Sequence, residues 1–231
     1  MSDASRMPHS DTIRVAVVDD QELMRSALTM MVETQSDFEL VGEAVDGHEA
    51  LALVRGRRVD VVLMDLRMPK LDGIQATEII TRELPTTRVL ALTTFDLDEY
   101  VFPALRAGAS GFLLKDARGE EVVEAIRTVH AGHGVVAPST TRRLIEHVAT
   151  TPADSGADAE AIRARLTPRE LDMLREVATG ATNAEIAARL HLSENTVKTH
   201  VGHVLSKLEL RDRVQAVVLA YESGVVGRSS R

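Results

Sequence analysis

The sequence lacks cysteine and tryptophan, and aromatic residues make up only 3% of its 231 residues. Without cysteine, disulfides, thiolate metal sites and cysteine nucleophiles are excluded, which fits a reducing compartment. No apolar run approaches the roughly 18 residues that a transmembrane helix needs. Residues 1–11 are too polar and acidic for a signal peptide. These absences predict a cytoplasmic protein that has an aliphatic core and no membrane partner.

The charge of the chain is distributed unevenly along its length. Residues 1–162 carry 16 Lys/Arg and 27 Asp/Glu, a net charge of −11, and residues 163–231 carry 11 and 8, a net charge of +3. The length suits one large or two small domains. The imbalance favours two domains, of which the second is a candidate for binding nucleic acid. Ordinary compositional scatter would give the same imbalance, so charge alone does not decide.

Residues 13 to about 132 alternate short apolar segments with amphipathic ones. Strands are predicted over Ile13–Val18, Phe38–Ala44, Val59–Met64, Arg88–Thr93 and Ser110–Leu114. Helices are predicted over residues 21–35, 47–57, 73–83, 97–107 and 119–132. Five successive strand–helix units predict an α/β domain with a doubly wound parallel sheet and right-handed crossovers.

Beyond residue 132 the predicted structure is helical. A helix is expected near Ser139–Ala149, and the small, polar residues 150–162 predict a flexible linker. The expected domains are therefore 12–132, a helix and linker over 133–162, and 163–228. Four short helices in the last part predict a small all-α domain, with N-caps at Thr167, Thr182, Ser193 and Asp212.

Carboxylates stand at the C-terminal ends of two predicted strands. Asp19 and Asp20 follow the first strand, and Asp65 follows the third. In a sheet of order 2-1-3-4-5 the first and third strands are neighbours, so these side chains should lie together. Clustered carboxylates repel one another unless a cation lies among them. Hard carboxylate oxygens suit Mg²⁺, so the sequence predicts a magnesium site at this edge.

Two more polar groups follow the next strands. Thr93 ends the fourth strand and Lys115 follows the fifth. Carboxylates, a metal ion, a hydroxyl and an ammonium on one edge suit a phosphoryl group, with Asp65 as the nucleophile. Each piece alone has a plainer explanation, since a pair of aspartates is usually a solvated turn and a single lysine a surface residue. Their joint occurrence at successive strand ends is what supports the prediction.

Four motifs mark these strand ends. They are Val18-Asp19-Asp20, Met64-Asp65-Leu66-Arg67-Met68-Pro69, Leu92-Thr93-Thr94 and Gly111-Phe112-Leu113-Leu114-Lys115. Together they resemble the receiver domain of two-component response regulators over about residues 12–132. The resemblance implies a flavodoxin-like five-stranded sheet and phosphorylation of Asp65 by a sensor histidine kinase.

The resemblance also implies a role for each neighbour of Asp65. Asp20, Asp65 and the backbone carbonyl of Arg67 would bind Mg²⁺, with Asp19 close by. Lys115 would hold one phosphoryl oxygen, Thr93 would move to bond another, and Phe112 would follow as the switch aromatic. Arg67 and Phe95 flank the path of an attacking water, and we hypothesise that the bulky Phe95 slows loss of the phosphoryl group.

Residues 193–207 form an amphipathic helical pattern. Its apolar stripe contains Val197, Val201, Val204, Leu205 and Leu208, and its opposite face is acid-free, small and basic. Such a face suits a DNA major groove, although periodicity alone would favour an ordinary solvated face. The motifs Leu166–Glu170, Asn183–Ala187 and Thr196–Val201 resemble a LuxR-type helix-turn-helix over about residues 163–225. A receiver followed by this domain is the NarL/FixJ arrangement.

This second resemblance implies which residues meet DNA. Lys198 and Thr199 would lie nearest the base edges, on the face that also carries His203. Thr196, His200, Lys207, Arg211 and Arg213 would contact phosphates. Gly202 departs from the larger polar residue that relatives often carry, and the last helix, Asp212–Ser223, would form a dimer surface.

Both resemblances imply a DNA-binding transcriptional response regulator that is not an enzyme, apart from its own phosphoryl transfer and hydrolysis. Phosphorylation would drive formation of a homodimer on double-stranded DNA. A Mg²⁺-dependent hydrolase of the haloacid dehalogenase type is an alternative, but such enzymes have a second Asp where Arg67 stands here. Two further alternatives are a phosphorylation-independent DNA-binding protein and a phosphorelay intermediate, the latter disfavoured by the helix-turn-helix.

Overall fold

The computed structural model describes residues 12–93, 97–132, 134 and 156–226. The first domain contains β1 (Ile13–Val18), α1 (Glu22–Glu33), β2 (Phe38–Ala44), α2 (Gly47–Gly56), β3 (Val61–Asp65), α3 (Gly73–Glu83), β4 (Arg88–Thr93), α4 (Leu97–Arg106), β5 (Gly111–Leu114) and α5 (Gly119–His130). The second contains α7 (Gly156–Arg165), α8 (Pro168–Ala178), α9 (Asn183–Leu190), α10 (Glu194–Lys207) and α11 (Arg213–Glu222). The predicted helix near 139–149 lies outside the described residues.

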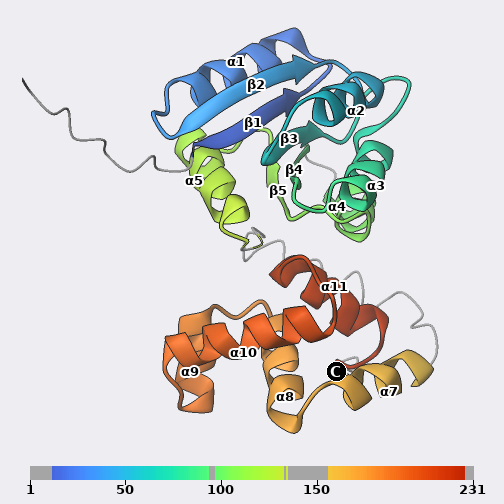
Figure 1. Ribbon diagram of the computed structural model, residues 1–231, viewed down its shortest axis with the longest axis vertical. Coiled ribbons are helices and arrows are strands. Elements are labelled where there is room, and N and C mark those ends of the chain that lie inside the picture. The colour runs from blue at the N-terminus through green and yellow to red at the C-terminus, as the bar shows by residue number, and fades with distance from the viewer. Residues whose placement is uncertain (1–11, 94–96, 133, 135–155, 227–231) are drawn as a thin grey trace, which may run out of the picture.

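The five strands form one parallel sheet of order β2-β1-β3-β4-β5, which confirms the predicted topology (Figure 1). The central strand β3 is buried on both faces, as its unbroken apolar sequence predicts. Val61 and Leu63 pack in the cluster that holds α1 and α5, and Val62 and Met64 pack against α2 and α3. This alternation follows from the two-residue period of a strand.

Two differences from the predicted boundaries matter, one for the site and one for the second domain. β3 runs from Val61 to Asp65 rather than from Val59 to Met64. Asp65 is itself the last residue of the strand and pairs with Leu92 of β4. The carboxylate is therefore anchored by the sheet ladder. The second difference is α7, which begins at Gly156 inside the expected linker 150–162, because Ala159 and Ile162 are buried in the second domain.

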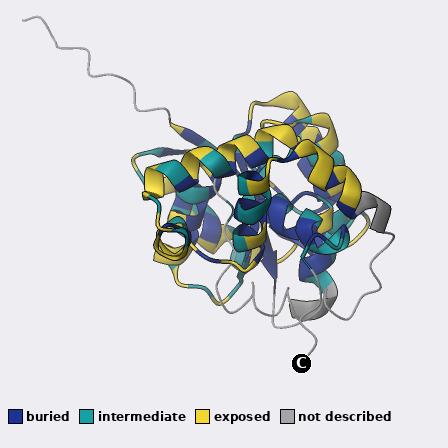
Figure 2. Ribbon diagram, turned by 90° about the horizontal axis from the view of Figure 1, so that it is seen from below, coloured by how far each residue is buried: buried dark blue, intermediate teal, exposed yellow. Residues whose placement is uncertain are grey.

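Helices α8 to α11 begin at the predicted caps. The side chains of Thr167, Thr182, Ser193 and Asp212 each accept a hydrogen bond from a backbone N–H in the first turn of α8, α9, α10 and α11. The buried faces of these helices enclose one apolar core, and exposed residues lie outside (Figure 2). Within the described ranges, none of the helices has the length and apolar character needed to cross a membrane.

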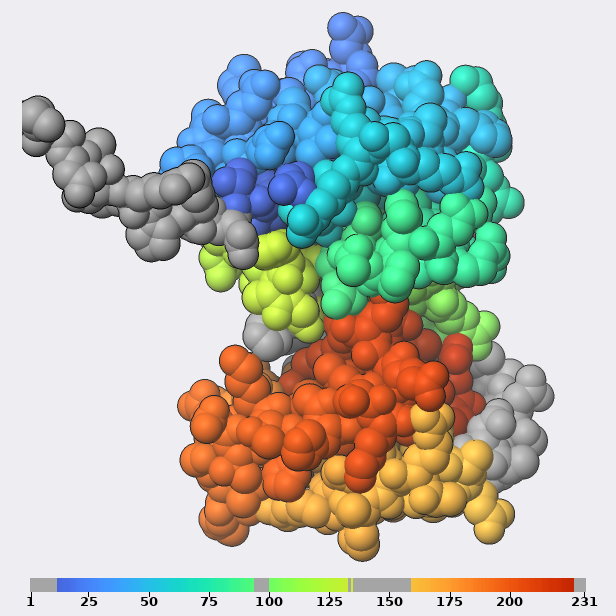
Figure 3. Space-filling model, viewed as in Figure 1, coloured from blue at the N-terminus to red at the C-terminus, as the bar shows by residue number. Residues whose placement is uncertain are grey.

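The second domain meets the first through α11. In the space-filling view its red C-terminal segment lies directly beneath the green part of the first domain (Figure 3). One apolar cluster joins Phe102 and Leu105 of α4 with Val217 and Val218 of α11. The two domains are thus packed on each other in this structure rather than held apart.

Candidate functional site

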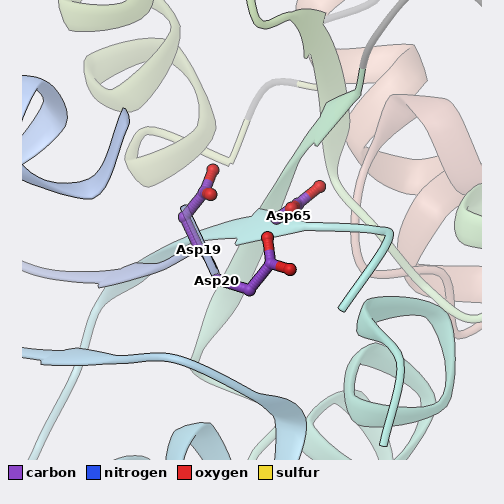
Figure 4. Close-up of side chains that lie close together, drawn as sticks. All are labelled: Asp19, Asp20 and Asp65. Atoms are coloured by element: carbon purple, nitrogen blue, oxygen red, sulfur yellow. The ribbon is translucent and has the colours of Figure 1, made fainter. Parts of the chain in front are cut away.

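The candidate site lies at the C-terminal edge of the sheet, between β1 and β3. Asp65 ends β3 and is almost fully buried, Asp19 is completely buried after β1, and Asp20 is exposed beside it. One carboxylate oxygen from each of the three residues lies within 4.8 Å of the others (Figure 4). The structure therefore brings together the three carboxylates that the sequence analysis placed in one group.

Lys115 neutralises part of this negative charge. Its ammonium Nζ lies 2.8 Å from Asp19 Oδ2 and 2.7 Å from Asp65 Oδ2, and its side chain is 6% exposed. Burial raises the pKa of Asp65, while the hydrogen bond and charge of Lys115 lower it. A buried cation thus lies among the carboxylates, as their mutual repulsion requires. Its predicted contact with a phosphoryl oxygen stays a prediction.

The loops that carry the carboxylates are fixed by backbone contacts. Asp65 Oδ1 accepts a hydrogen bond from the backbone N–H of Arg67 at 3.2 Å, and Asp19 Oδ1 accepts one from Gln21 at 2.9 Å. Arg25 of α1 donates to the backbone oxygen of Asp19 at 2.9 Å. Nothing in the sequence pointed to Arg25, because a contact with a backbone oxygen has no spacing signature.

A second contact that the sequence analysis missed holds the loop after β3. Lys70 has a left-handed backbone conformation, with φ 67°, and its ammonium lies 2.5 Å from Asp46 Oδ2. Asp46 is buried and also caps α2 through a bond from Glu49 N. Close by, Gly47 N donates to Leu71 O at 3.0 Å. The loop between Asp65 and α3 is therefore attached to the start of α2.

An open pocket of about 350 Å³ lies over these groups. Its lining consists of Asp20, Gln21, Asp65, Arg67 and Lys115. The pocket exposes hard carboxylate oxygens beside two cationic side chains. That donor set fits a small divalent cation such as Mg²⁺, together with a tetrahedral anion such as a phosphoryl group.

Thr93 and Phe112 lie on the neighbouring strands. Thr93 is buried at the end of β4, and its backbone oxygen accepts a hydrogen bond from Lys115 N at 2.8 Å. Phe112 is buried on β5 in the same cluster as Phe102 and Leu105 of α4. These positions connect the site with α4, as a switch pair requires, while the switching itself stays a prediction. Phe95 lies outside the described residues.

The predicted DNA helix is α10. Val197, Val201 and Val204 are buried against the domain core, as the apolar stripe predicted. The opposite face is open, and its exposed residues are Asn195, Lys198, Thr199, Gly202, His203, Ser206 and Lys207. Thr196 and His200 are partly buried, and the backbone N–H of Thr196 donates to Ser193 Oγ, which caps the helix. Apart from Glu194 in the first turn, the exposed residues of α10 carry no acid, so a small and basic surface is available to a major groove.

Three basic residues at or beyond the C-terminal end of α10 bind protein groups in the structure. Lys207 forms an ion pair with Glu170 of α8 at 2.6 Å. Arg211 donates to backbone oxygens of the first domain. Arg213 donates to Asn183 Oδ1 at 2.8 Å and to the backbone oxygen of Ala181. Their predicted phosphate contacts would therefore require these side chains to exchange partners or to share them.

The Glu170–Lys207 pair predicts a pH-dependent stability of the second domain. The hydrogen bond from Lys207 lowers the pKa of Glu170 from 4.5 to about 2. When a carboxyl group has a lower pKa in the folded state than in the unfolded state, it stabilises the folded state at pH values above its unfolded-state pKa. This stabilisation is lost as the pH falls through the folded-state pKa. We expect Glu170→Gln to lower the Tm at neutral pH, and the difference from wild type to vanish between pH 4.5 and 2.

Thermal unfolding followed by circular dichroism over this pH range measures the effect. Glu160→Gln, at an exposed position of α7, serves as the matched control and should leave the Tm unchanged. A Tm difference for Glu170→Gln that persists at pH 2 would contradict the assignment to this ion pair.

Two protein-family models match the chain. The response regulator receiver domain matches residues 15–127, and the family described as bacterial regulatory proteins, luxR family, matches residues 164–220. The first contains the carboxylate cluster, and the second contains α8 to α10 and most of α11. The matches agree with the two domains seen in the structure.

Similar proteins match over both domains together. The uncharacterized transcriptional regulatory protein YxjL of Bacillus subtilis (strain 168) is 43% identical, over 94% of this chain and 99% of its own length. The response regulator protein VraR of Staphylococcus aureus (strain Mu3 / ATCC 700698) is 38% identical, over 93% of this chain and 99% of its own length. Among solved structures, the response regulator ChrA of a heme-sensing two-component system is 32% identical over 94% and 100%, with a TM-score of 0.51.

Proposed function

This chain belongs to the response regulators that join a receiver domain to a LuxR-type DNA-binding domain, and we propose that a sensor histidine kinase phosphorylates it on Asp65. It is a DNA-binding transcriptional response regulator. The single observation that supports Asp65 as the phosphoacceptor is its place at the end of β3, in the open pocket, 2.7 Å from Lys115. The protein acts through binding, and its only chemistry is its own phosphoryl transfer and hydrolysis.

In the proposed step, a carboxylate oxygen of Asp65 forms a bond to phosphorus as the donor's phosphorus–nitrogen bond breaks. The leaving imidazole keeps the electron pair and takes up a proton. Lys115 is placed to hold a phosphoryl oxygen, because it already contacts the Asp65 carboxylate. The charge of its ammonium favours the ionised, nucleophilic form of Asp65 against the effect of burial.

The site fits Mg²⁺, with Asp20, Asp65 and the carbonyl of Arg67 as ligands and Asp19 close by. The ion would neutralise charge on the phosphoryl oxygens. The chain's own residues set the geometry, because Asp65 and Asp19 are each oriented by a backbone N–H two residues later.

Phosphorylation adds about −1.5 to −2 charges and strong acceptors at this edge. Thr93 would turn towards the new oxygens, and Phe112 would follow into the space it leaves. Two copies would then pair through α11 and place two α10 helices on a two-fold related DNA site. We place this activity in the cytoplasm, where the kinase and the DNA are both accessible.

The test uses the full chain, a small acyl phosphate and Mg²⁺. Wild type is expected to gain the mass of one phosphoryl group and to sediment as a dimer, and Asp65→Asn to gain nothing. Asp116→Asn, an exposed acid next to Lys115, is the matched control and should behave as wild type. No mass gain on wild type, or an equal gain on Asp65→Asn, would sink the proposal.

The same samples separate the alternatives. Steady hydrolysis of generic phosphate esters that depends on Asp65 would favour the hydrolase. Equal mobility shifts of DNA by wild type and Asp65→Ala, both treated with the phosphodonor, would favour DNA binding that does not depend on phosphorylation.

A further inference from the structure

Arg211 of the second domain is bound by the first. It stands between α10 and α11, and its Nη2 donates to Thr87 O at 2.5 Å and to Pro85 O at 3.1 Å. Both acceptors are backbone oxygens of the segment that leads into β4. The guanidinium is therefore inserted into the receiver, although it lies only a few residues beyond the exposed face of α10.

The rest of α11 extends this contact along α4. Gln215 Nε2 donates to Leu105 O at 3.0 Å and to Ala109 O at 3.2 Å, at the C-terminal end of α4. At the other end of α11, Glu222 forms an ion pair with Arg106. The receiver thus covers α11 and the Arg211 side chain, and Figures 1 and 3 show the two domains meeting there.

The same arrangement leaves the DNA face of α10 open. Lys198, Thr199 and His203 are all exposed in the packed structure. The receiver therefore does not cover these three side chains. The packed arrangement instead makes the Arg211 side chain and the surface of α11 unavailable to other partners.

The contact satisfies Arg211 only in part. Its Nε and Nη1 are buried, and neither has a hydrogen-bond partner among residues 12–93, 97–132, 134 and 156–226. Beside it, Arg88 Nη1 and Asp212 Oδ2 form a buried ion pair at 4.0 Å, which is too long for a hydrogen bond. Buried guanidinium nitrogens of Arg211 without a hydrogen bond disfavour the packed form. A DNA phosphate, with several strong acceptor oxygens, would bind the guanidinium better.

We propose that the receiver and DNA compete for Arg211. The proposal rests on the DNA-binding function above and adds that one side chain serves both as the interdomain contact and as a phosphate contact. When the two domains are packed together, DNA binding is weaker although α10 is uncovered. The packed form lacks one phosphate contact per subunit, and its α11 is not available for dimerisation. Conversely, DNA by itself shifts the protein towards the open form, because it binds a group that only the open form releases.

A substitution at Gly134 can disturb the contact between the receiver and α11 while Arg211 itself stays unchanged. A Cβ added at Gly134 would lie 2.1 Å from Val214 Cγ2 and 3.0 Å from Val214 N of α11. The methyl group added in Gly134→Ala would therefore push α11 away from Gly134, which follows α5 of the receiver. Gly56, at the end of α2, has no heavy atom within 4 Å of the added Cβ, so Gly56→Ala is the matched control. Arg106→Gln is a second, milder opening variant.

The experiment measures amide hydrogen exchange in α11 and the affinity of the unphosphorylated full chain for a mixed-sequence DNA duplex. We expect Gly134→Ala to speed exchange and raise affinity about tenfold. Arg106→Gln should raise it about two- to threefold, since the ion pair is partly exposed. Arg211→Ala should also speed exchange in α11, yet bind DNA about tenfold more weakly than Gly134→Ala. For Arg211→Ala, the slope of the logarithm of the DNA-binding constant against the logarithm of salt concentration should fall in magnitude by about one unit per subunit.

Two results would overturn the competition. One is Arg211→Ala gaining affinity as much as Gly134→Ala with an unchanged salt dependence, because Arg211 would then not meet DNA. The other is an Arg211→Ala variant whose amide exchange in α11 is as slow as in wild type, because Arg211 would then not hold the domains together. Absence of DNA binding by every variant and by phosphorylated wild type would instead refute the proposed function.

Discussion

Lys115→Met is expected to destabilise the receiver domain by several kcal/mol and to stop phosphoryl transfer to Asp65. Lys115 is the cation that contacts both buried carboxylates, Asp19 and Asp65. Removing one partner from a buried ionic group costs about 3–5 kcal/mol, because the remaining charge has no compensation. The pKa of Asp65, which burial already raises, would rise further. A larger share of the carboxyl would then be protonated and unable to attack phosphorus.

Urea unfolding with and without Mg²⁺ measures the first effect. Mg²⁺ should restore much of the stability of Lys115→Met, since a divalent cation can take the place of the lost charge. Asp19→Asn in the same background should also recover part of it, because one of the repelling carboxylates is gone. Arg55→Met, which removes one partner of an ion pair with Glu83 that is exposed on both sides, is the control and should cost far less.

The phosphorylation step is measured on the same variants by mass gain from an acyl phosphate. A Lys115→Met protein that unfolds like wild type without Mg²⁺ would show that the ammonium does not balance the carboxylates. A protein that unfolds early but is phosphorylated at the wild-type rate would separate the stabilising role from the chemical one.

The fold was predictable from the sequence because its signals are local. Each strand is a short apolar run, helices α8 to α11 each begin at a capping residue, and successive strand–helix units permit few topologies. The grouping of Asp19, Asp20 and Asp65 followed from the same logic, since parallel strands end at one edge of the sheet. The predicted sheet order is confirmed.

The remaining features depend on contacts that leave no trace in a pattern of residue types. Arg25 and Arg211 bind backbone oxygens, which every residue carries, so no partner residue reveals the contact. The left-handed conformation of Lys70 arises from the loop it belongs to rather than from a glycine. Helix α7 has little apolar periodicity, and only Ala159 and Ile162 reveal the packing that makes it part of the second domain.

Gly73→Ala is expected to be the most damaging single-carbon change near the site. Gly73 is the first residue of α3, and its N–H donates to Leu66 O at 3.1 Å. An added Cβ would lie 1.9 Å from Asp65 O and 2.8 Å from both Asp65 C and Leu66 Cα. All three atoms belong to the backbone, so no side chain can rotate away. Forced overpacking of this kind costs about 3 kcal/mol or more.

The strain would fall on the phosphoacceptor itself. To admit the methyl group, either α3 must move away from the sheet or the end of β3 must shift, and the second displaces the Asp65 carboxylate from Lys115. We therefore expect a lower urea midpoint together with slower phosphorylation. Gly56→Ala, also a glycine at a helix end, has open space around the added carbon and should change neither. Equal midpoints and rates for Gly73→Ala and Gly56→Ala would mean that α3 does not rest on the Asp65 backbone in solution.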